Sequence, residues 1–289
     1  MNYRPSRIKV LGVYSKRLLR YRKISTPFLS GDAFASLCDV TFQPPKFQSH
    51  NPSEMEILAA NSIFVKSDHL ESFLAKYGRH LSARVIVCGN SDFEFHEVPK
   101  NLPDSIQLLL LQNSFVSDGN RIRTLPIGIE NFRWGVNGNP KFITPTSSDG
   151  SERKILFGPF GDTHPTRLQV KNFLISSESQ KWDFVDEYIE PPLFDKLTSR
   201  YAYVAAVRGN GVDTHRLWET LYRNRIPIIE ESSWSRSLRD LNLPILEVSK
   251  WGEAELFKEL AKLNTHVQVQ SQNLPELWLP YWRDLIRKY

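Results

Sequence analysis

Short apolar runs alternate along the chain with segments whose apolar positions recur at helical spacing. The clearest example spans residues 203–230, where an apolar run ends in Arg208, a turn follows at Gly209–Gly211, and a helix (213–223) leads into a second apolar run at 226–229. Buried parallel strands read as apolar runs, and helices connect them. The pattern therefore predicts the α/β class.

The same alternation continues before and after this segment. A stretch at 136–152 is rich in Gly, Pro, Ser and Thr, which is typical of a linker between two sets of elements. We expect strands at 7–14, 62–65, 84–88, 106–111, 123–129, 154–157, 182–185 and 244–248, and helices at 31–38, 53–60, 69–77, 165–175, 192–199 and 252–263.

The predicted organisation is two Rossmann-like domains facing a cleft, residues 1–145 and 146–274, followed by a C-terminal helix at 275–289. That helix carries Trp278, Trp282 and Leu285 at helical spacing, which indicates a docking face. In a parallel sheet, ligands bind beyond the carboxyl ends of the strands. The polar residues that follow the strands are therefore the candidates for a site.

Composition indicates a folded protein without a membrane anchor. The chain has 289 residues, of which 40% are hydrophobic and 24% charged. Its apolar runs stay well short of the ~20 residues of a membrane span, and no signal peptide is recognisable. Cys38 and Cys88 lie in apolar surroundings, which predicts buried free thiols. We expect a cytoplasmic bacterial protein.

Positive charge is concentrated at the start of the chain, whose net charge is +5. A solvated basic face is the plainest interpretation, and peripheral contact with the anionic inner membrane is the next. Nucleic acid is the weaker partner, because zinc-finger spacing and RNA-recognition motifs are missing. The basic residues before the first acid are Arg4, Arg7, Lys9, Lys16, Arg17, Arg20, Arg22 and Lys23.

The loop after the run at 203–207 carries groups that suit an anionic ligand. Arg208 and Arg216 can neutralise a diphosphate, since arginine matches phosphate oxygens with a planar fork. A helix N-terminus adds free N–H groups and partial positive charge. His215 and Glu219 share a helix face, and Glu219 can accept from ribose hydroxyls. The plainer alternative for Glu219 is an ion pair with Arg223.

A second strand–loop–helix, at 154–175, offers Thr163 and Arg167 as another wall of the same site; a capped helix with a surface arginine is the alternative. Asp213 is likewise either a ligand group or an ordinary helix N-cap. A nucleotide-linked sugar fits these groups. The candidate donor-binding residues are Arg208, Gly211, Asp213, Thr214, His215, Arg216, Glu219, Thr163 and Arg167.

Asp92 is the first candidate for a catalytic base. It follows a strand end, where a carboxylate can take a proton from a substrate hydroxyl, although an Asx-turn explains it equally well. Asp32 and Glu130 compete with it for this role. The sequence contains no HExxH, CxxC, GxSxG or D-x-D signature, so we expect neither a metal nor a cofactor.

The segment GNGVDTHRLWETLYRNRIPII at 209–229 resembles the donor-binding motif of exostosin-like glycosyltransferases and their small bacterial and viral relatives. Other segments are similar to further motifs of that family and occur in the same order. They are GNSD at 89–92, LQN at 111–113, LPIGIEN at 125–131, and LPILEV at 243–248 followed by Trp251.

The resemblance implies a GT-B fold with the donor on the C-terminal domain, a C-terminal helix that crosses back, and transfer without a metal. It places Arg208, Asp213, His215, Arg216 and Glu219 around the nucleotide and diphosphate, and Asp92 on the acceptor side. The other acceptor-side candidates are Asn90, Asn113 and Asn131.

We therefore predict a glycosyltransferase that moves a sugar from a nucleotide sugar to a glycan or lipid-linked oligosaccharide in bacterial surface polysaccharide biosynthesis, with inversion. One alternative is a non-catalytic nucleotide-sugar or glycan-binding protein with the same fold. Another is an α/β enzyme that uses the basic N-terminus to bind nucleic acid.

Overall fold

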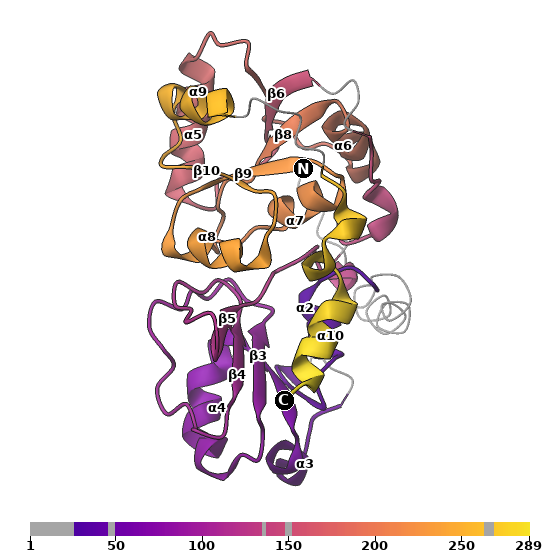
Figure 1. The fold of residues 1–289 in the computed structure, drawn as a ribbon, viewed down its shortest axis with the longest axis vertical. Coiled ribbons are helices and arrows are strands. Elements are labelled where there is room, and N and C mark those ends of the chain that lie inside the picture. The colour runs from indigo at the N-terminus through magenta and orange to yellow at the C-terminus, as the bar shows by residue number, and fades with distance from the viewer. Residues whose placement is uncertain (1–25, 46–49, 135–136, 148–151, 263–268) are drawn as a thin grey trace, which may run out of the picture.

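The computed structural model describes residues 26–45, 50–134, 137–147, 152–262 and 269–289. Within them the chain forms two parallel sheets of five strands each, one above the other in Figure 1. This confirms the predicted α/β class. The predicted strand at 7–14 and the basic cluster before Asp32 lie outside the described residues.

The first sheet has the strand order β1-β2-β3-β4-β5. Its central strands are buried along their whole length, which explains their apolar runs. The sequence did not predict β1, a half-buried edge strand of three residues. The elements are α2 (Gly31–Ala35), β1 (Val40–Phe42), α3 (Glu54–Ala59), β2 (Ser62–Lys66), η2 (Ser67–His69), α4 (Leu70–Tyr77), η3 (Gly78–His80), β3 (Val85–Gly89), β4 (Leu108–Leu111), β5 (Ile122–Thr124) and η4 (Phe132–Trp134).

The second sheet has the order β10-β9-β8-β6-β7. A helix that the sequence did not predict, α8, begins with a capping box between Ser232 and Ser235. The elements are η5 (Pro140–Phe142), β6 (Glu152–Phe157), α5 (Pro165–Ser176), β7 (Trp182–Phe184), α6 (Pro191–Thr198), β8 (Tyr201–Ala205), α7 (His215–Tyr222), β9 (Ile226–Glu230), α8 (Ser233–Ser237), η6 (Leu238–Leu241), β10 (Leu246–Val248), α9 (Glu253–Lys262) and η7 (Ser271–Asn273).

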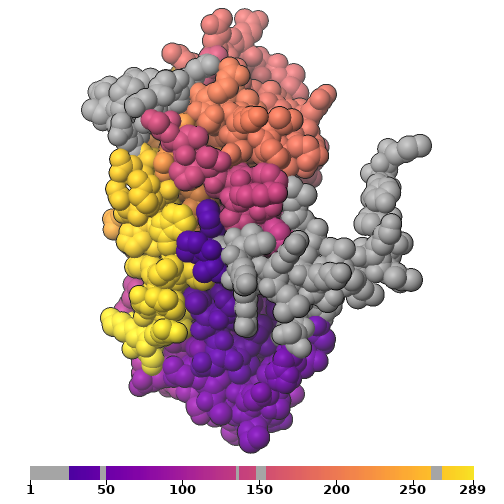
Figure 2. Space-filling model, turned by 90° about the vertical axis from the view of Figure 1, so that its right-hand side faces the viewer, coloured from indigo at the N-terminus to yellow at the C-terminus, as the bar shows by residue number. Residues whose placement is uncertain are grey.

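The chain ends on the first sheet's side of the molecule. After η8 (Pro275–Leu277), the helix α10 (Leu279–Arg287) runs beside α2 (Figures 1 and 2). Trp282, on the predicted apolar stripe, is only 1% exposed and meets the ring of Phe34 edge to face at 5.6 Å. Trp282 therefore packs into the core, and Trp278 and Leu285 of the same stripe pack against it while partly buried.

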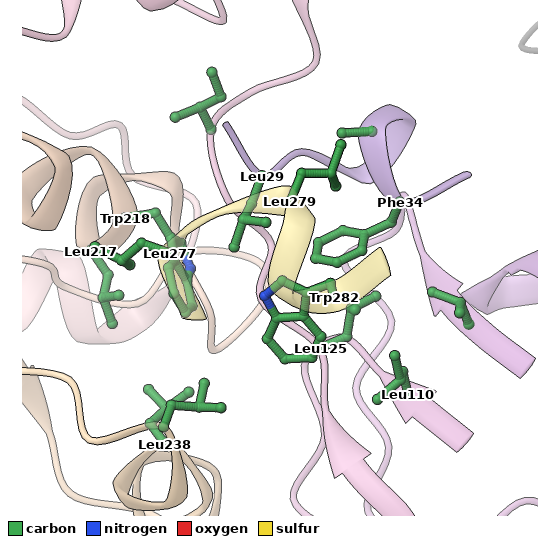
Figure 3. Packing of buried hydrophobic residues seen from close by; sticks show 14 of the residues in the cluster. Leu29, Phe34, Leu110, Leu125, Leu217, Trp218, Leu238, Leu277, Leu279 and Trp282 are labelled. Carbon is green, nitrogen blue, oxygen red and sulfur yellow. The ribbon is translucent and has the colours of Figure 1, made fainter. Parts of the chain in front are cut away.

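One hydrophobic cluster joins the two sheets (Figure 3). Leu29 and Leu125 enter it from the first sheet's side, Trp218 and Leu238 from the second, and Leu277 from the C-terminal segment. Apolar area removed from water stabilises by about 25 cal/mol per Å², so a shared cluster resists separation of the sheets. The loops that leave both sheets are held in fixed relation.

The predicted linker is packed rather than loose over its described part. Ile143 is buried, and the Phe142 carbonyl accepts a hydrogen bond from Arg223 Nη2 at 2.8 Å. The Thr144 amide donates to Asp195 Oδ1 at 3.1 Å. These contacts anchor the connection to α6 and α7.

The structure also describes the two cysteines and the length and polarity of its helices. Cys38 is half-buried and Cys88 buried, and both are free thiols, as expected. Across the parts of the chain that the structure describes, no helix combines the length and the apolar character needed to span a membrane.

The Tyr222 hydroxyl provides a test of the junction between the two sheets and the C-terminal segment. It accepts from the Leu29 amide at 3.0 Å and donates to the Leu277 carbonyl at 2.6 Å. Tyr222→Phe leaves both backbone groups unsatisfied, so we expect a loss of about 1–3 kcal/mol in the free energy of unfolding measured in urea. The exposed Tyr188→Phe is the matched control, and an equal effect of the two variants would contradict this account of the junction.

Candidate active site at the junction of the sheets

Two cavities meet between the sheets. The first, about 650 Å³, is lined mainly by the loops after β6 and β8 and by the start of α7. The second, about 690 Å³, is lined mainly by the loops after β2, β3 and β5. Four residues line both cavities: Asp92, Ile127, Glu130 and His215. Any reaction between molecules held in the two cavities would take place beside them.

Asp213 fastens the loop before α7 to the first sheet. Its carboxylate is buried and accepts from the Ile127 amide and from Trp218 Nε1, each at 2.8 Å. Burial raises the pKa of Asp213 to about 7, and hydrogen bonds from Ile127, Trp218 and the Thr214 backbone only partly oppose that effect. Thr214, not Asp213, occupies the N-cap position of α7. Asp213 lines the first cavity, but its carboxylate is already bound within the protein.

Asn113 completes this attachment from the end of β4. Its Oδ1 accepts from the Asp213 amide at 2.9 Å and its Nδ2 donates to the Ser91 carbonyl at 3.1 Å. It is fully buried and is not among the residues lining either cavity. Gly211 packs against it so closely that a Cβ would lie 2.6 Å from Asn113 Nδ2. Gly211 is required here for close packing.

Arg216 is half-buried and lies along the wall of the first cavity. It donates to the carbonyls of Gly158 at 2.8 Å and Pro159 at 3.2 Å, and its guanidinium lies 4.2 Å from the ring centre of Phe194. Burial lowers the pKa of Arg216 to about 10, so it stays charged at neutral pH. Glu219 Oε2 lies 3.9 Å from its Nε.

Glu219 makes the ion pair that was the plainer of its two expected roles. It lines the first cavity, and its Oε2 also lies 3.7 Å from Nη1 of Arg223. Arg223 in turn binds Asp195 at 2.7 Å. The ion pair that was the plainer alternative therefore exists, and it orients Glu219 at the cavity wall.

Arg208 and Arg167 direct their hydrogen bonds and ion pair mainly to loop residues rather than into the first cavity. Arg208 is not among the lining residues, and its Nη2 pairs with Glu94 Oε1 at 2.5 Å across the two sheets. Arg167 lines the first cavity while donating to the Arg208 and Gly161 carbonyls and to Thr163 Oγ1, each at 3.0 Å. Thr163 lines the cavity with it.

Asp32 belongs to a buried network behind the second cavity. It pairs with Arg133 Nη2 at 3.0 Å and accepts from Asn90 Nδ2 at 3.2 Å. Burial raises the pKa of Asp32 to about 6, although Arg133 opposes the shift. Asn131 donates to Asn90 Oδ1 at 2.8 Å and accepts from the Asp32 amide. Asn90 and Asn131 line the second cavity, whereas Asp32 is not among its lining residues.

Asparagine has a backbone role at two of these positions. Asn90 and Asn113 each follow a strand and adopt the left-handed region, with φ of 59° and 54°. Asparagine tolerates this conformation better than most residues. The pattern of Asn after strand ends therefore reflects turn geometry as well as a candidate site.

Three residues that can accept a proton line both cavities. Asp92 is exposed and accepts from Asn210 Nδ2 at 3.2 Å. Burial raises the pKa of Glu130, while His215 lowers it and Glu219 raises it. His215 shares a hydrogen bond of 2.8 Å between its Nδ1 and the Gly128 carbonyl. The structure therefore brings Asp92 and Glu130 together and separates them from Asp32.

The second cavity combines exposed aromatic rings with polar groups. Phe93 is 45% and Trp134 48% exposed, and both line it. Lys66 and Arg133, the cations of its lining, are paired with Asp68 and Asp32 respectively.

Sequence reasoning missed the residues that support the candidates. Phe194 lies under Arg216, Glu94 pairs with Arg208, and the Gly128 carbonyl holds His215. Each pair is separated by more than 20 positions in the chain, so no local pattern signals the contact. As for metals, the described residues contain no group of three or more His, Cys, Asp or Glu that could bind an ion. Metal-independent chemistry stays a prediction.

The close approach of Gly211 to Asn113 is testable. Gly211→Ala forces a methyl group against a side chain that is hydrogen-bonded on both sides, so we expect about 1–3 kcal/mol of destabilisation in urea unfolding. Gly252→Ala is the matched control, because a Cβ there meets nothing within 4 Å. An unchanged stability of Gly211→Ala would show that this contact is not tight.

Asp213 predicts a pH dependence of stability. Its pKa is about 7 in the folded protein and near 3.8 when unperturbed, so its contribution is fully present below about pH 4 and is lost as pH rises through about 7. Asp213→Asn cannot titrate. Its stability deficit relative to the wild type should therefore shrink between those pH values in urea unfolding. The exposed Asp240→Asn should run parallel to the wild type; a parallel profile for Asp213→Asn would be the contrary result.

Comparison with known proteins adds little to this geometry. No protein-family model and no curated protein matches the chain. Among solved structures, it is similar to one described as "Crystal structure of AviGT4, a glycosyltransferase involved in Avilamycin A biosynthesis", with 11% sequence identity and a TM-score of 0.36 over 78% of this chain and 84% of that chain. A likeness of this size leaves the activity of this chain to be argued from its site.

Proposed function

We propose that this protein is a glycosyltransferase that moves a sugar from a nucleotide-sugar donor to a glycan or lipid-linked acceptor. The observation that carries the proposal is the pair of cavities with a common wall at Asp92, Glu130 and His215. A transfer reaction needs two substrates whose reacting atoms meet, and each cavity is large enough for one of them. The segment that resembles the donor motif lines the first cavity.

The donor is assigned to the first cavity. Arg216 supplies a half-buried positive charge, and the N-terminus of α7 supplies unpaired amides and a favourable dipole for a diphosphate. Thr214 Oγ1 lies beside them, buried and without a hydrogen-bond partner among the described residues. A phosphate oxygen would give it one. Phe160 and Tyr188 line the same cavity and offer rings against which a nucleobase can stack.

The acceptor is assigned to the second cavity. Sugars present apolar C–H faces and polar rims, which match the exposed rings of Phe93 and Trp134 and the amides of Asn90, Gln112 and Asn131. The cations of this lining are already paired with carboxylates, which favours a neutral acceptor sugar over a phosphorylated one.

The reaction follows from the placement of the two substrates. A hydroxyl of the acceptor attacks the anomeric carbon while the bond from that carbon to the diphosphate breaks. The electron pair leaves with the diphosphate, where Arg216 and the α7 dipole stabilise the developing charge. The hydroxyl proton passes to a group at the common wall. A single displacement of this kind inverts the anomeric carbon and needs no metal ion.

We place the enzyme in bacterial surface polysaccharide biosynthesis, in the cytoplasm or at the inner face of the membrane. The basic cluster before Asp32 supports contact with anionic lipid. Nucleic acid has no part in this proposal.

Arg216→Ala tests the leaving-group role. Removing the cation that faces the developing charge should cost about 2–4 kcal/mol of transition-state stabilisation, a fall of 30- to 1,000-fold in kcat/KM. The assay is release of nucleoside diphosphate from a panel of UDP- and GDP-sugars. Arg236→Ala, an exposed arginine outside both cavities, is the matched control. A fall of less than tenfold for Arg216→Ala would remove it from the mechanism, and nucleotide binding without turnover by the wild type would favour a binding protein.

A further inference from the structure

His215 is held in one tautomer by the opposite sheet. Its Nδ1 lies 2.8 Å from the Gly128 carbonyl, and a carbonyl can only accept, so Nδ1 carries the proton. In the neutral ring, the lone pair is then on Nε2. Gly128 has φ of 68°, and a Cβ there would lie 2.2 Å from the Leu29 carbonyl oxygen. Gly128, whose carbonyl orients the ring, is therefore held in place by its close packing against Leu29.

The free nitrogen of this ring belongs to the wall between the cavities. His215 lines both of them, and its Nε2 has no hydrogen-bond partner among the residues that the structure describes. The other candidates are less suited to accept a proton. Asp92 is exposed to water and already accepts from Asn210. Glu130 already accepts a hydrogen bond from the side chain of Asn137.

Two carboxylates lie in the surroundings of His215. Glu130 interacts with it electrostatically, and Glu219 lies one turn further along the same helix. The Asp213 carboxylate binds Ile127 and Trp218, and the Arg216 guanidinium is directed to the Gly158 and Pro159 carbonyls. Glu130 and Glu219 are therefore the carboxylates placed to interact with a proton taken up by this ring.

We propose that His215 is the catalytic base of the transfer. This inference rests on the proposed function and names the group that takes the proton. As the acceptor oxygen bonds to the anomeric carbon and the diphosphate departs with its electron pair, the hydroxyl proton moves to Nε2. Glu130 stabilises the imidazolium, and the Gly128 carbonyl keeps the ring aimed at the wall. This proposal gives His215 the role of base in place of the nucleotide-ligand role that we predicted from the sequence.

The test separates proton transfer from donor binding. His215→Asn keeps an amide N–H for the Gly128 carbonyl but removes the base. Nucleoside diphosphate release from UDP- and GDP-sugars, with water as acceptor, should fall at least 100-fold. Binding of UDP or GDP, measured by calorimetry, should stay within about threefold of the wild type. In His215→Ala, added imidazole should restore part of the turnover. The exposed His80→Asn, far from both cavities, is the matched control.

Other results of the His215 experiments would overturn either the inference or the proposed function, and the two cases can be told apart. A fall in UDP or GDP affinity that matches the fall in turnover would make His215 a donor ligand and overturn the inference. Near-normal turnover of His215→Asn would also overturn it, and Asp92→Asn and Glu130→Gln would then identify the base. If His215→Asn fails to fold, absence of imidazole rescue in folded His215→Ala counts against it. A wild type that turns over no donor of the panel overturns the proposed function itself.

Discussion

The buried carboxylate of Asp213 is the point on which the site depends. It sits in the loop after β8, yet it bonds to the amide of Ile127 from the first sheet and to the indole of Trp218 on α7. Asn113, from the end of β4, binds the backbone of the same residue. A buried carboxylate is stable only when its oxygen atoms are satisfied, so the two sheets must meet in this arrangement.

This attachment explains why the cavities share a wall. The Ile127 amide and the His215 ring each make a hydrogen bond between loops of the two sheets, and both residues line both cavities. The hydrophobic cluster around Trp218 and Leu277 supplies the bulk of the cohesion, while the polar contacts determine the register of the loops. A shift of about 1 Å between the sheets would separate the reacting groups of the two substrates, and shifts of this size cost catalysis heavily.

The sequence predicted helices and strands well where the local pattern of apolar residues identifies a single type of element. Apolar runs such as those of β3 and β9 mark buried strands, whereas the three-residue edge strand β1 has no such run. Side-chain roles were less predictable. We predicted Asp213 to be a donor ligand, with a helix cap as the alternative, but its partner at position 127 is 86 residues away. Arg208 and Arg216 looked equivalent, and only the fold directs one to Glu94 and the other to the cavity.

The most direct test of this account is a calorimetric titration of the wild-type protein with UDP and GDP beside uridine and guanosine. If the N-terminus of α7 and Arg216 form a diphosphate site, at least one nucleoside diphosphate binds far more tightly than its nucleoside, and Arg216→Ala removes most of the difference. Equal binding of diphosphate and nucleoside, or no binding of either, would contradict the assignment of a sugar-nucleotide donor to the first cavity.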